Sequence, residues 1–486
     1  MTHEVLLSYI DGLVASTTDD GAYVIETPPS AFRPGLRISP CSEGLSRALS
    51  RFARDGGSSM EALYPDVLTS DGPGGLPRLQ QAIGRLAQHA MLATTLVSDG
   101  EPLATLHPVS ALFDMRPKKV PEGAAYRLSK FACWHVRDGV ARLISPCGHA
   151  ELRLRSPKAS AFLHLLASDV SAHTLQQDSG LSPEVVGSLL GFLHSMDALV
   201  SVSADQPDPE QSTASLAQWD FHDLLFHSRS RLGRHDGPFG GTFPFKDRFQ
   251  MLPVQKPRMS NDVVALSRPD LDVLADSEPA FTRILEARES IREQDNDNPI
   301  TLEQLAEFLY RTARVKQVAE QAGVCWKPTP GGGALHEIEI YPLVENCRGL
   351  ARGLYHYRAL DHELVKVAEP GPELDSLSNI MAITGTLQQP SQIGLILAAR
   401  FQRVQFKYQS MAYAVMLKNL GAMYQTMYLV ATAMQLAPCA LGGGHADLFS
   451  RAAGLDYLEE SSIGEFMLGT RAAQRTRTDP NVSGGH

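Results

Sequence analysis

A lysine and a tyrosine lie side by side at Lys407 and Tyr408, directly before a long apolar stretch. A lysine amine can take up a proton and a phenol can donate one, so this pair is suited to general acid or base chemistry. The structural alternative is that Lys407 pairs with an acidic side chain and Tyr408 packs in a core. The residue types alone leave both interpretations open.

Two arginines flank a hydroxyl in Arg288-Glu289-Ser290-Ile291-Arg292, at the end of a predicted helix that begins near Glu278. Guanidinium groups and a hydroxyl donor match the acceptor oxygens of a phosphate monoester. The string therefore indicates a phosphate site, although a solvated helix end explains the same pattern when it stands alone.

Glycines gather in Pro330-Gly331-Gly332-Gly333, ahead of a predicted strand in which Ile338 and Ile340 alternate with glutamates. Glycine lets the backbone approach a flat ligand closely, with N–H groups directed at it. The alternative is a flexible turn without a ligand.

A capped helix, several strands and one long helix must position these groups. The segment from Thr301 to Gln304 has the pattern of a capping box, and residues 353–357 and 393–399 are predicted strands. Residues 411–441 predict a buried core or interface helix. A membrane span is disfavoured because polar side chains interrupt every window of about 18 residues, namely Lys418, Asn419, Gln425 and Gln435.

Two N-terminal segments share the outline of a winged helix, a strand pair followed by three helices. The first has predicted strands near 5–14 and 23–27, helices near 42–52, 60–64 and 76–92, and a hairpin that turns at Asp99-Gly100. The second has a strand pair in 131–154, three helices and a closing strand at 199–202. Its last helix is the clearest, because Ser182 can cap it and Pro183 suits its first turn.

Charge argues against a DNA-binding role for the second segment. Residues 159–206 contain no lysine or arginine but five acidic residues, and the whole chain has a net charge of -10. A phosphate backbone would be repelled rather than attracted. Two interpretations stay open: the fold binds a peptide as an added strand, or it is a scaffold that only packs on the rest of the chain.

Composition predicts a multidomain protein, since 486 residues with 43% apolar content exceed one core. The six cysteines are scattered without metal-ligand spacing, so we expect reduced thiols and no metal. The first residues lack the basic and apolar regions of a signal peptide, which favours a cytoplasmic location. Residues 204–217 predict a linker, and residues 237–257 an irregular arm.

The order of these strings resembles one family. The arginine–serine string, the glycine string, Gly353-Leu354-Tyr355-His356-Tyr357, and Lys407-Tyr408 before an apolar helix resemble the SagB/ThcOx-type azoline dehydrogenases of the nitroreductase superfamily, over about residues 266–469. The strings FHSRSR at 226–231 and GGT at 240–242 favour this branch over a plain nitroreductase. Two winged-helix-like domains ahead of the oxidase resemble its cyanobactin-type member.

The resemblance implies an FMN-bound homodimer that oxidises thiazoline or oxazoline rings in a peptide to thiazoles or oxazoles, with O2 as the final electron acceptor. It assigns the FMN phosphate to Arg288, Ser290 and Arg292, and proton removal from the ring to Lys407 and Tyr408. The residues expected beside the flavin are Pro330, Gly331, Gly332, Gly333, Gln425, Gly442 and Gly443. Gly331 stands where the family usually has a serine, so one side-chain donor would be missing.

The predicted fold class is α+β. It comprises winged-helix-like domains at 1–115 and 120–204, a linker and arm at 205–260, a nitroreductase-like FMN domain of antiparallel or mixed sheet flanked by helices at 261–475, and a flexible tail at 476–486. Two other functions remain open: an NAD(P)H-dependent nitroreductase or ene-type reductase of small molecules, and a non-catalytic peptide-binding scaffold. The peptide could be ribosomal or attached to a carrier protein; neither a nucleic-acid nor a membrane partner is expected.

Overall fold

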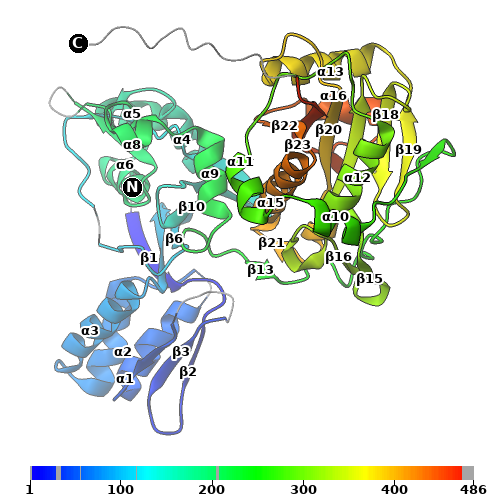
Figure 1. The fold of residues 1–486 in the computed structure, drawn as a ribbon. Coiled ribbons are helices and arrows are strands. Elements are labelled where there is room, and N and C mark those ends of the chain that lie inside the picture. Colours follow the sequence, from blue (N-terminus) through cyan, green and yellow to red (C-terminus); the bar gives the residue numbers. More distant parts are fainter. Residues whose placement is uncertain (1–2, 29–33, 55, 117, 204–206, 473–486) are drawn as a thin grey trace, which may run out of the picture. The chain divides into compact units, whose positions relative to one another are not determined.

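The computed structural model describes residues 3–28, 34–54, 56–116, 118–203 and 207–472. Over this range the chain divides into two compact units, Met1–Phe239 and Gly240–His486 (Figure 1). Residues 240–260, part of the predicted linker and arm, therefore belong to the second unit. The predicted tail at 476–486 lies outside the described residues.

The first half of the first unit packs three helices on a small sheet. Its elements are β1 (His3–Tyr9), β2 (Val14–Thr17), β3 (Tyr23–Glu26), β4 (Leu36–Ile38), α1 (Glu43–Ser50), α2 (Met60–Asp71), α3 (Gly75–Gln88), β5 (Leu92–Ser98) and β6 (Glu101–Pro108). Strands β2, β3 and β4 pair in that order. Tyr23 and Ile25 of β3 pack with Leu49, Leu63 and Leu86 of the helices in one buried core.

The second half repeats this plan with its own helices. Its elements are β7 (Ala125–Leu128), β8 (Cys133–Arg137), β9 (Val140–Ile144), β10 (Ala150–Leu154), α4 (Pro157–Leu165), β11 (Val170–Ser171), α5 (Ala172–Ser179), α6 (Pro183–Ser195) and β12 (Leu199–Val202). The predicted cap of α6 is confirmed, because Ser182 Oγ accepts a hydrogen bond from Val185 N and Pro183 begins the helix. The strand pair predicted in 131–154 is three strands, because β10 pairs with β9 after the β8–β9 hairpin.

The two halves share one sheet, which the sequence patterns did not predict. Within the described residues six strands pair in the order β1-β5-β6-β10-β9-β8, and the β6–β10 pairing joins the halves from Ala104 opposite Leu154 to Pro108 opposite Ala150. Buried ion pairs lie on the second half's strands: Glu151 accepts from both Arg142 (2.7 Å) and Arg153 (2.8 Å). The two winged-helix-like segments are therefore continuous through their strands.

Part of the predicted linker is folded against the first unit. After β12 come α7 (Pro209–Ser212), α8 (Ala214–Ala217) and α9 (Phe221–Arg229). Glu210 of α7 is 5% exposed and accepts hydrogen bonds from Ser129 Oγ and Lys130 N. An ion pair with Arg127 at 3.3 Å completes its environment.

The second unit is built around one antiparallel sheet. Its strands and helices are β13 (Gly240–Gly241), β14 (Val263–Ala265), α10 (Leu271–Ser277), α11 (Phe281–Ala287), α12 (Leu302–Ala313), β15 (Gln317–Ala319), β16 (Val324–Trp326), β17 (Ile338–Val344), β18 (Gly353–Arg358), β19 (Glu363–Ala368), α13 (Pro372–Thr384), β20 (Ile393–Arg400), α14 (Phe401–Gln405), β21 (Tyr408–Gln409), α15 (Ala412–Ala433), β22 (Leu436–Leu441), α16 (Ala446–Ala453) and β23 (Glu460–Thr470). Seven of the described strands pair in the order β14-β19-β18-β17-β20-β23-β22.

Helices cover both faces of this sheet (Figure 1). Alternate residues of β17 point to opposite sides: Ile338 and Ile340 pack in the core that contains α12 and α15, and Tyr341 and Leu343 in the core that contains α13 and α16. The capping box predicted for α12 is confirmed, with Thr301 and Gln304 bonded reciprocally. Helices on an antiparallel sheet confirm the predicted α+β class.

The long apolar stretch is only partly helical, so the prediction of a single helix over 411–441 was wrong. Helix α15 ends at Ala433, Gln435 has a φ of +57°, and the remainder forms β22, which pairs with β23. The reason is tertiary: the apolar run supplies both a buried helix face and a buried strand, and hydrophobicity alone does not separate them. No helix among the described residues has the length and apolar character needed to cross a bilayer.

Candidate active site

The Lys407–Tyr408 pair is held by the arm that begins the second unit. Tyr408 pairs with Gly241 across the short β13–β21 ladder, and Phe243 N donates to the Lys407 carbonyl oxygen at 3.1 Å. Lys407 Nζ lies 5.7 Å from the centroid of the Phe243 ring and 5.3 Å from that of the Tyr408 ring. Aromatic rings at this distance attract a cation and so restrict where the amine can lie.

The glycine loop contacts this pair although it is more than seventy residues away in sequence. Gly333 has a φ of +66°, and a Cβ placed there would lie 2.8 Å from both Lys407 Nζ and Tyr408 Oη. Only glycine accepts both this backbone conformation and this close approach. The loop and the pair therefore form one cluster, which we call the amine cluster: Gly331, Gly332, Gly333, Lys407 and Tyr408.

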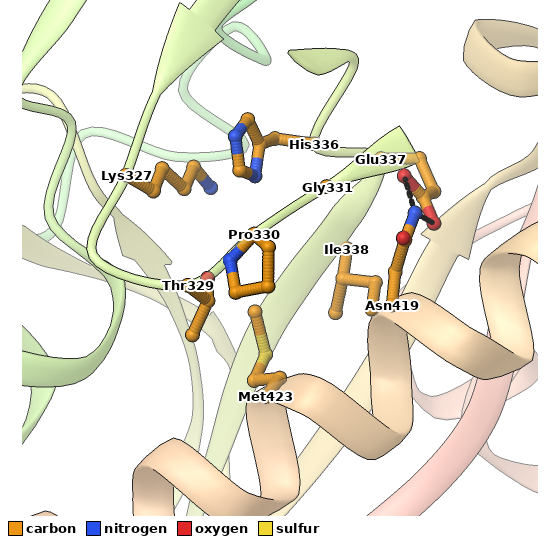
Figure 2. Close-up of a pocket in the computed structure, with 9 residues that line it drawn as sticks. All are labelled: Lys327, Thr329, Pro330, Gly331, His336, Glu337, Ile338, Asn419 and Met423. Atoms are coloured by element: carbon orange, nitrogen blue, oxygen red, sulfur yellow. Dashed lines mark hydrogen bonds between the residues drawn. The ribbon is translucent and has the colours of Figure 1, made fainter. Parts of the chain in front are cut away.

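Asn419 of α15 anchors the glycine loop, a role the sequence patterns did not reveal. Its Oδ1 accepts from Gly332 N at 3.0 Å. Its Nδ2 donates to the Glu337 carboxylate at 2.9 and 3.2 Å, the contact drawn in Figure 2. Gly332 also packs so closely that an added Cβ would collide with Val415. Glu337 is fully buried, and burial raises the pKa of its carboxyl group, although the Asn419 hydrogen bond opposes this.

His336 fills the space beside Gly331. A Cβ on Gly331 would lie 2.9 Å from His336 Nδ1, so any larger residue there would displace the ring. Lys327 and His336 point toward one another above Pro330 (Figure 2). Burial first, then the charges of Lys327 and Arg403, lower the pKa of His336 to about 4, which keeps the imidazole neutral at pH 7.

Two further buried side chains border the loop. Arg403 is fully buried. Its guanidinium donates hydrogen bonds to the backbone carbonyl oxygens of Leu335 (2.9 Å), Leu252 (2.7 Å) and Gly323 (2.8 Å). It thereby ties the loop, the arm and the β15–β16 hairpin together. Thr329 is 2% exposed, and its hydroxyl has no hydrogen-bond partner among the described residues. Thr329 lines a small pocket together with Lys327, Pro330 and His336 (Figure 2).

The predicted phosphate element lies beside the C-terminal half of α15. Ser290 Oγ and Tyr428 Oη are 2.8 Å apart, and the Arg288 guanidinium lies 5.4 Å from the Tyr428 ring centroid. Ile291 N donates to the carbonyl oxygen of Pro438 in β22 at 2.8 Å. Arg292 is exposed. We call Arg288, Ser290, Arg292 and Tyr428 the arginine cluster.

Gly442 and Gly443 directly follow β22. This is the strand whose Pro438 carbonyl oxygen accepts from Ile291 N. A Cβ at either position would meet nothing within 4 Å, whereas one at Gly444 would collide with Glu465. Gln425 is exposed on α15. The polar contact from this helix to the glycine loop is therefore Asn419, whose polarity within an apolar helix was the available signal.

The two clusters lie on opposite flanks of α15. Asn419, which anchors the amine cluster, and Tyr428, in the arginine cluster, are nine residues apart, equivalent to about 13.5 Å along the axis and roughly a half-turn around it. Leu420, Met423 and Met427, between them, are buried in the core under the sheet. One copy of the second unit thus presents the two predicted parts of the cofactor site in different directions.

Comparison with known families agrees with these features. Residues 126–236 match the family model of the cyanobactin oxidase ThcOx, and residues 285–470 match that of the nitroreductase family. The resemblance predicted from the sequence is thereby confirmed. The second match contains the arginine cluster, the glycine loop and the Lys407–Tyr408 pair.

Three relatives share part of the chain. A protein of Methanocaldococcus jannaschii named as a nitroreductase is 27% identical over 37% of this chain and 85% of its own length. The trifolitoxin-processing protein TfxB of Rhizobium leguminosarum bv. trifolii is 30% identical over 23% of this chain and 30% of its own. The microcin B17-processing protein McbC of Escherichia coli is 33% identical over 22% of this chain and 40% of its own. The chain thus aligns with less than half of either peptide-processing relative.

Proposed function

We propose, from the premise that this chain carries a nitroreductase-family domain and is an FMN-dependent oxidoreductase, that it oxidises thiazoline or oxazoline rings in a peptide to thiazoles or oxazoles. The observation that carries the proposal is the contact of Lys407 and Tyr408 with the glycine loop through Gly333. It is supported by a ThcOx match in the same chain and by relatives named for processing trifolitoxin and microcin B17.

The proposed reaction removes two hydrogens from one ring. A proton leaves the ring carbon next to the carbonyl, and a hydride leaves the neighbouring carbon; bound FMN supplies the hydride acceptor, with O2 as the final electron acceptor. Lys407 Nζ takes the proton, and Tyr408 Oη, on the same side of Gly333, orients the ring. The Phe243 ring, 5.7 Å from Nζ, stabilises the ammonium group that forms when the amine takes up the proton.

The residues present fit FMN. Arg288 and Arg292 form no ion pair within the described residues, so both guanidinium groups are available to the phosphate. The unpartnered Thr329 hydroxyl and the glycine loop supply donors for the ring system. Gly442 and Gly443, with open space beside them, can present backbone N–H groups to its edge. Pro330 and Gln425 complete the assigned set.

The different flanks of α15 support a site that two copies of the chain build together. In one copy, buried residues of α15 separate the two clusters, and the amine cluster of one copy can face the arginine cluster of another. Exposed apolar side chains on the same unit, including Tyr413 (44%) and Leu417 (37%) of α15, suit such an interface. We therefore propose a twofold dimer with two composite sites.

Subunit mixing tests the composite site. Lys407→Ala disables the amine cluster, and Arg288→Ala disables the arginine cluster. Random re-pairing makes half of the dimers mixed, and each mixed dimer has one intact composite site, so activity should return to about a quarter of wild type. If each site lay within one copy, the mixture would be as inactive as its parents.

The activity itself is tested by visible absorption of the purified protein and by mass spectrometry of an azoline peptide incubated with it in air. The proposal expects a flavin spectrum and a loss of two hydrogens per ring. Lys407→Ala should keep FMN but lose ring oxidation, and Arg288→Ala should lose FMN. Retained turnover in the first variant, or a fully loaded second variant, contradicts the assigned roles.

A second candidate is a reductase of small molecules, favoured by the relative named as a nitroreductase, which this chain matches over most of that relative's length. It predicts consumption of NAD(P)H with a nitroaromatic or flavin acceptor and no change in azoline mass. The two candidates use the same cofactor site but differ in which molecule reduces it.

The first unit offers a place for the peptide on β8. This strand ends the six-stranded sheet, and Trp134 (60%) and Val136 (66%) are exposed on it. An unprotected edge with apolar side chains can accept another strand. Val136→Pro, which removes an edge N–H, should weaken binding of the full-length substrate peptide and leave turnover of a short azoline peptide unchanged. If the variant and wild type bind the full-length peptide equally well, only the scaffold interpretation of the first unit remains.

A further inference from the structure

A groove of about 800 Å³ lies in the second unit beside the amine cluster, and none of the roles above uses it. Three segments line it: residues 245–257 of the arm, residues 400–406 around α14, and residues 454–460 between α16 and β23. The side chains that give it an apolar wall are Phe245, Phe249, Leu252, Pro253, Phe406 and Leu455. Its size matches that of sites that bind small molecules or peptide side chains.

The charged groups in the groove floor are already paired. Lys256 Nζ donates to Glu460 at 2.6 Å and to Tyr341 Oη at 2.8 Å, and Arg400 pairs with Glu339 at 3.3 Å. Because these charges are neutralised within the protein, the floor offers little attraction to a charged ligand. The exposed acidic groups are at the rim, where Asp456 and Glu459 repel anions.

The outer wall is aromatic and held in place. Phe245 and Phe249 lie with ring centroids 5.9 Å apart, and the Arg248 guanidinium lies 5.3 Å from the Phe249 centroid. Phe249 nevertheless keeps 59% of its surface exposed. A large exposed ring on an ordered wall is typical of a surface that buries an apolar partner.

One aromatic contact links the groove to the proposed catalytic pair. Phe406 lines it and makes an edge contact with Phe243, with centroids 6.5 Å apart, and Lys407 Nζ lies 5.7 Å from that same Phe243 ring. The amine is therefore within about 12 Å of the Phe406 ring. An extended peptide covers that distance in three or four residues, at roughly 3.3–3.6 Å each.

We propose that this groove binds an apolar or aromatic side chain of the substrate peptide, three or four residues along the chain from the ring being oxidised. This inference rests on the proposed azoline oxidation and adds a specificity determinant to it. Burial of an apolar side chain against the apolar wall is favourable. The neutral floor does not favour a charged side chain, and the acidic rim disfavours aspartate or glutamate at the same position.

Binding is measured with fluorescently labelled peptides that already carry a thiazole, so the readout does not require turnover. One peptide has phenylalanine three residues from the ring, a second has aspartate there, and a third has the phenylalanine moved eight residues away. Burial of a phenylalanine side chain predicts at least about tenfold tighter binding of the first peptide to the FMN-loaded protein. The effect is measured for both directions along the peptide, and tighter binding in either one supports the proposal.

Phe249→Ala and Leu455→Asp should each reduce that preference to less than about threefold, with flavin absorption unchanged. Leu360→Ala, an exposed apolar residue outside the groove, should keep it. With the corresponding azoline peptides the preference should appear in KM rather than kcat.

Equal affinity for the three peptides, or a preference that survives both groove variants, overturns the inference. So does a loss of dimer mass in Leu455→Asp by light scattering, because the groove would then be covered by a second copy. Absence of ring oxidation in wild type, with the peptide preference intact, would instead count against the proposed function and leave the groove assignment in place.

Discussion

Replacing Asn419 with alanine tests whether this one side chain sets the glycine loop. The change removes the acceptor of Gly332 N and the donor to the Glu337 carboxylate in one step. Glu337 is fully buried, so its carboxylate depends on hydrogen bonds within the protein. The variant leaves the Gly332 N–H without its acceptor and the Glu337 carboxylate without its side-chain donor, inside the second unit.

The cost follows from these two groups. An unsatisfied buried polar group costs about 1–3 kcal/mol, and breaking the pairing of a buried charge about 3–5 kcal/mol. The carboxylate can escape part of this by taking up a proton, so we expect a loss of about 3–5 kcal/mol of unfolding free energy at pH 8 and about 1–3 kcal/mol at pH 5.

The sign of this pH dependence comes from linkage. Burial raises the pKa of Glu337 in the folded protein, and the Asn419 hydrogen bond holds it lower than burial alone would. Without Asn419 the folded pKa rises further, so the folded state of the variant must bind a proton that the unfolded chain releases. The difference between variant and wild type therefore grows as pH rises.

Urea unfolding followed by Trp326 fluorescence measures the effect, since the chain has three tryptophans and the other two, Trp134 and Trp219, can be replaced by phenylalanine. Lys418→Ala, an exposed change on the same helix, is the matched control and should lie within about 0.5 kcal/mol of wild type. An Asn419→Ala loss no larger than the control at pH 8, or one that grows toward pH 5, would refute the reasoning.

Three further predictions concern other parts of the structure. Gly333→Ala forces a Cβ against Lys407 Nζ at a φ of +66°, so ring oxidation should fall by about 100-fold, whereas Gly84→Ala, with open space beside it, should leave turnover unchanged in the same assay. His336 has a φ of +45°, which asparagine tolerates. Wild type should lose up to about 3 kcal/mol of unfolding free energy between pH 6.5 and pH 4, because the unfolded chain takes up a proton there that the folded histidine, with its pKa lowered to about 4, does not. His336→Asn should remove this loss, and pH-dependent urea midpoints that are unchanged by the substitution would contradict the prediction. Glu210→Ala should destabilise the first unit by about 2–4 kcal/mol, seen as a lower urea midpoint, because three donors lose a buried acceptor.

Local signals predicted the elements well. Ser182 and Thr301 begin helices as expected because a cap is a contact between residues two or three apart, and the sequence contains both partners. The strand at 393–399 was visible because it is buried along its whole length and reads as an apolar run. Each of these features depends on neighbours within a few residues.

Contacts between distant residues account for what the sequence did not reveal. The β6–β10 pairing merges two segments whose patterns are complete on their own. The partition of 411–441 into a helix and a strand depends on β23, which offers an edge to Leu436–Leu441. Arg403 has the sequence context of a surface arginine, yet its burial depends on three carbonyl oxygens from three separate loops.

The cofactor strings illustrate the same limit in their orientation. The sequence places Arg288 and Gly332 in order along the chain and says nothing about the side of α15 on which each comes to lie. In the folded protein the glycine loop lies on the side of α15 that carries Asn419, and the arginine cluster lies on the side that carries Tyr428. Buried residues of the helix lie between them. In the proposed composite site a ligand contacts the amine cluster of one copy and the arginine cluster of another, so this proposal makes self-association a condition of cofactor binding. We therefore expect loss of the dimer and loss of FMN to occur together, at a protein concentration set by the dimer's dissociation constant.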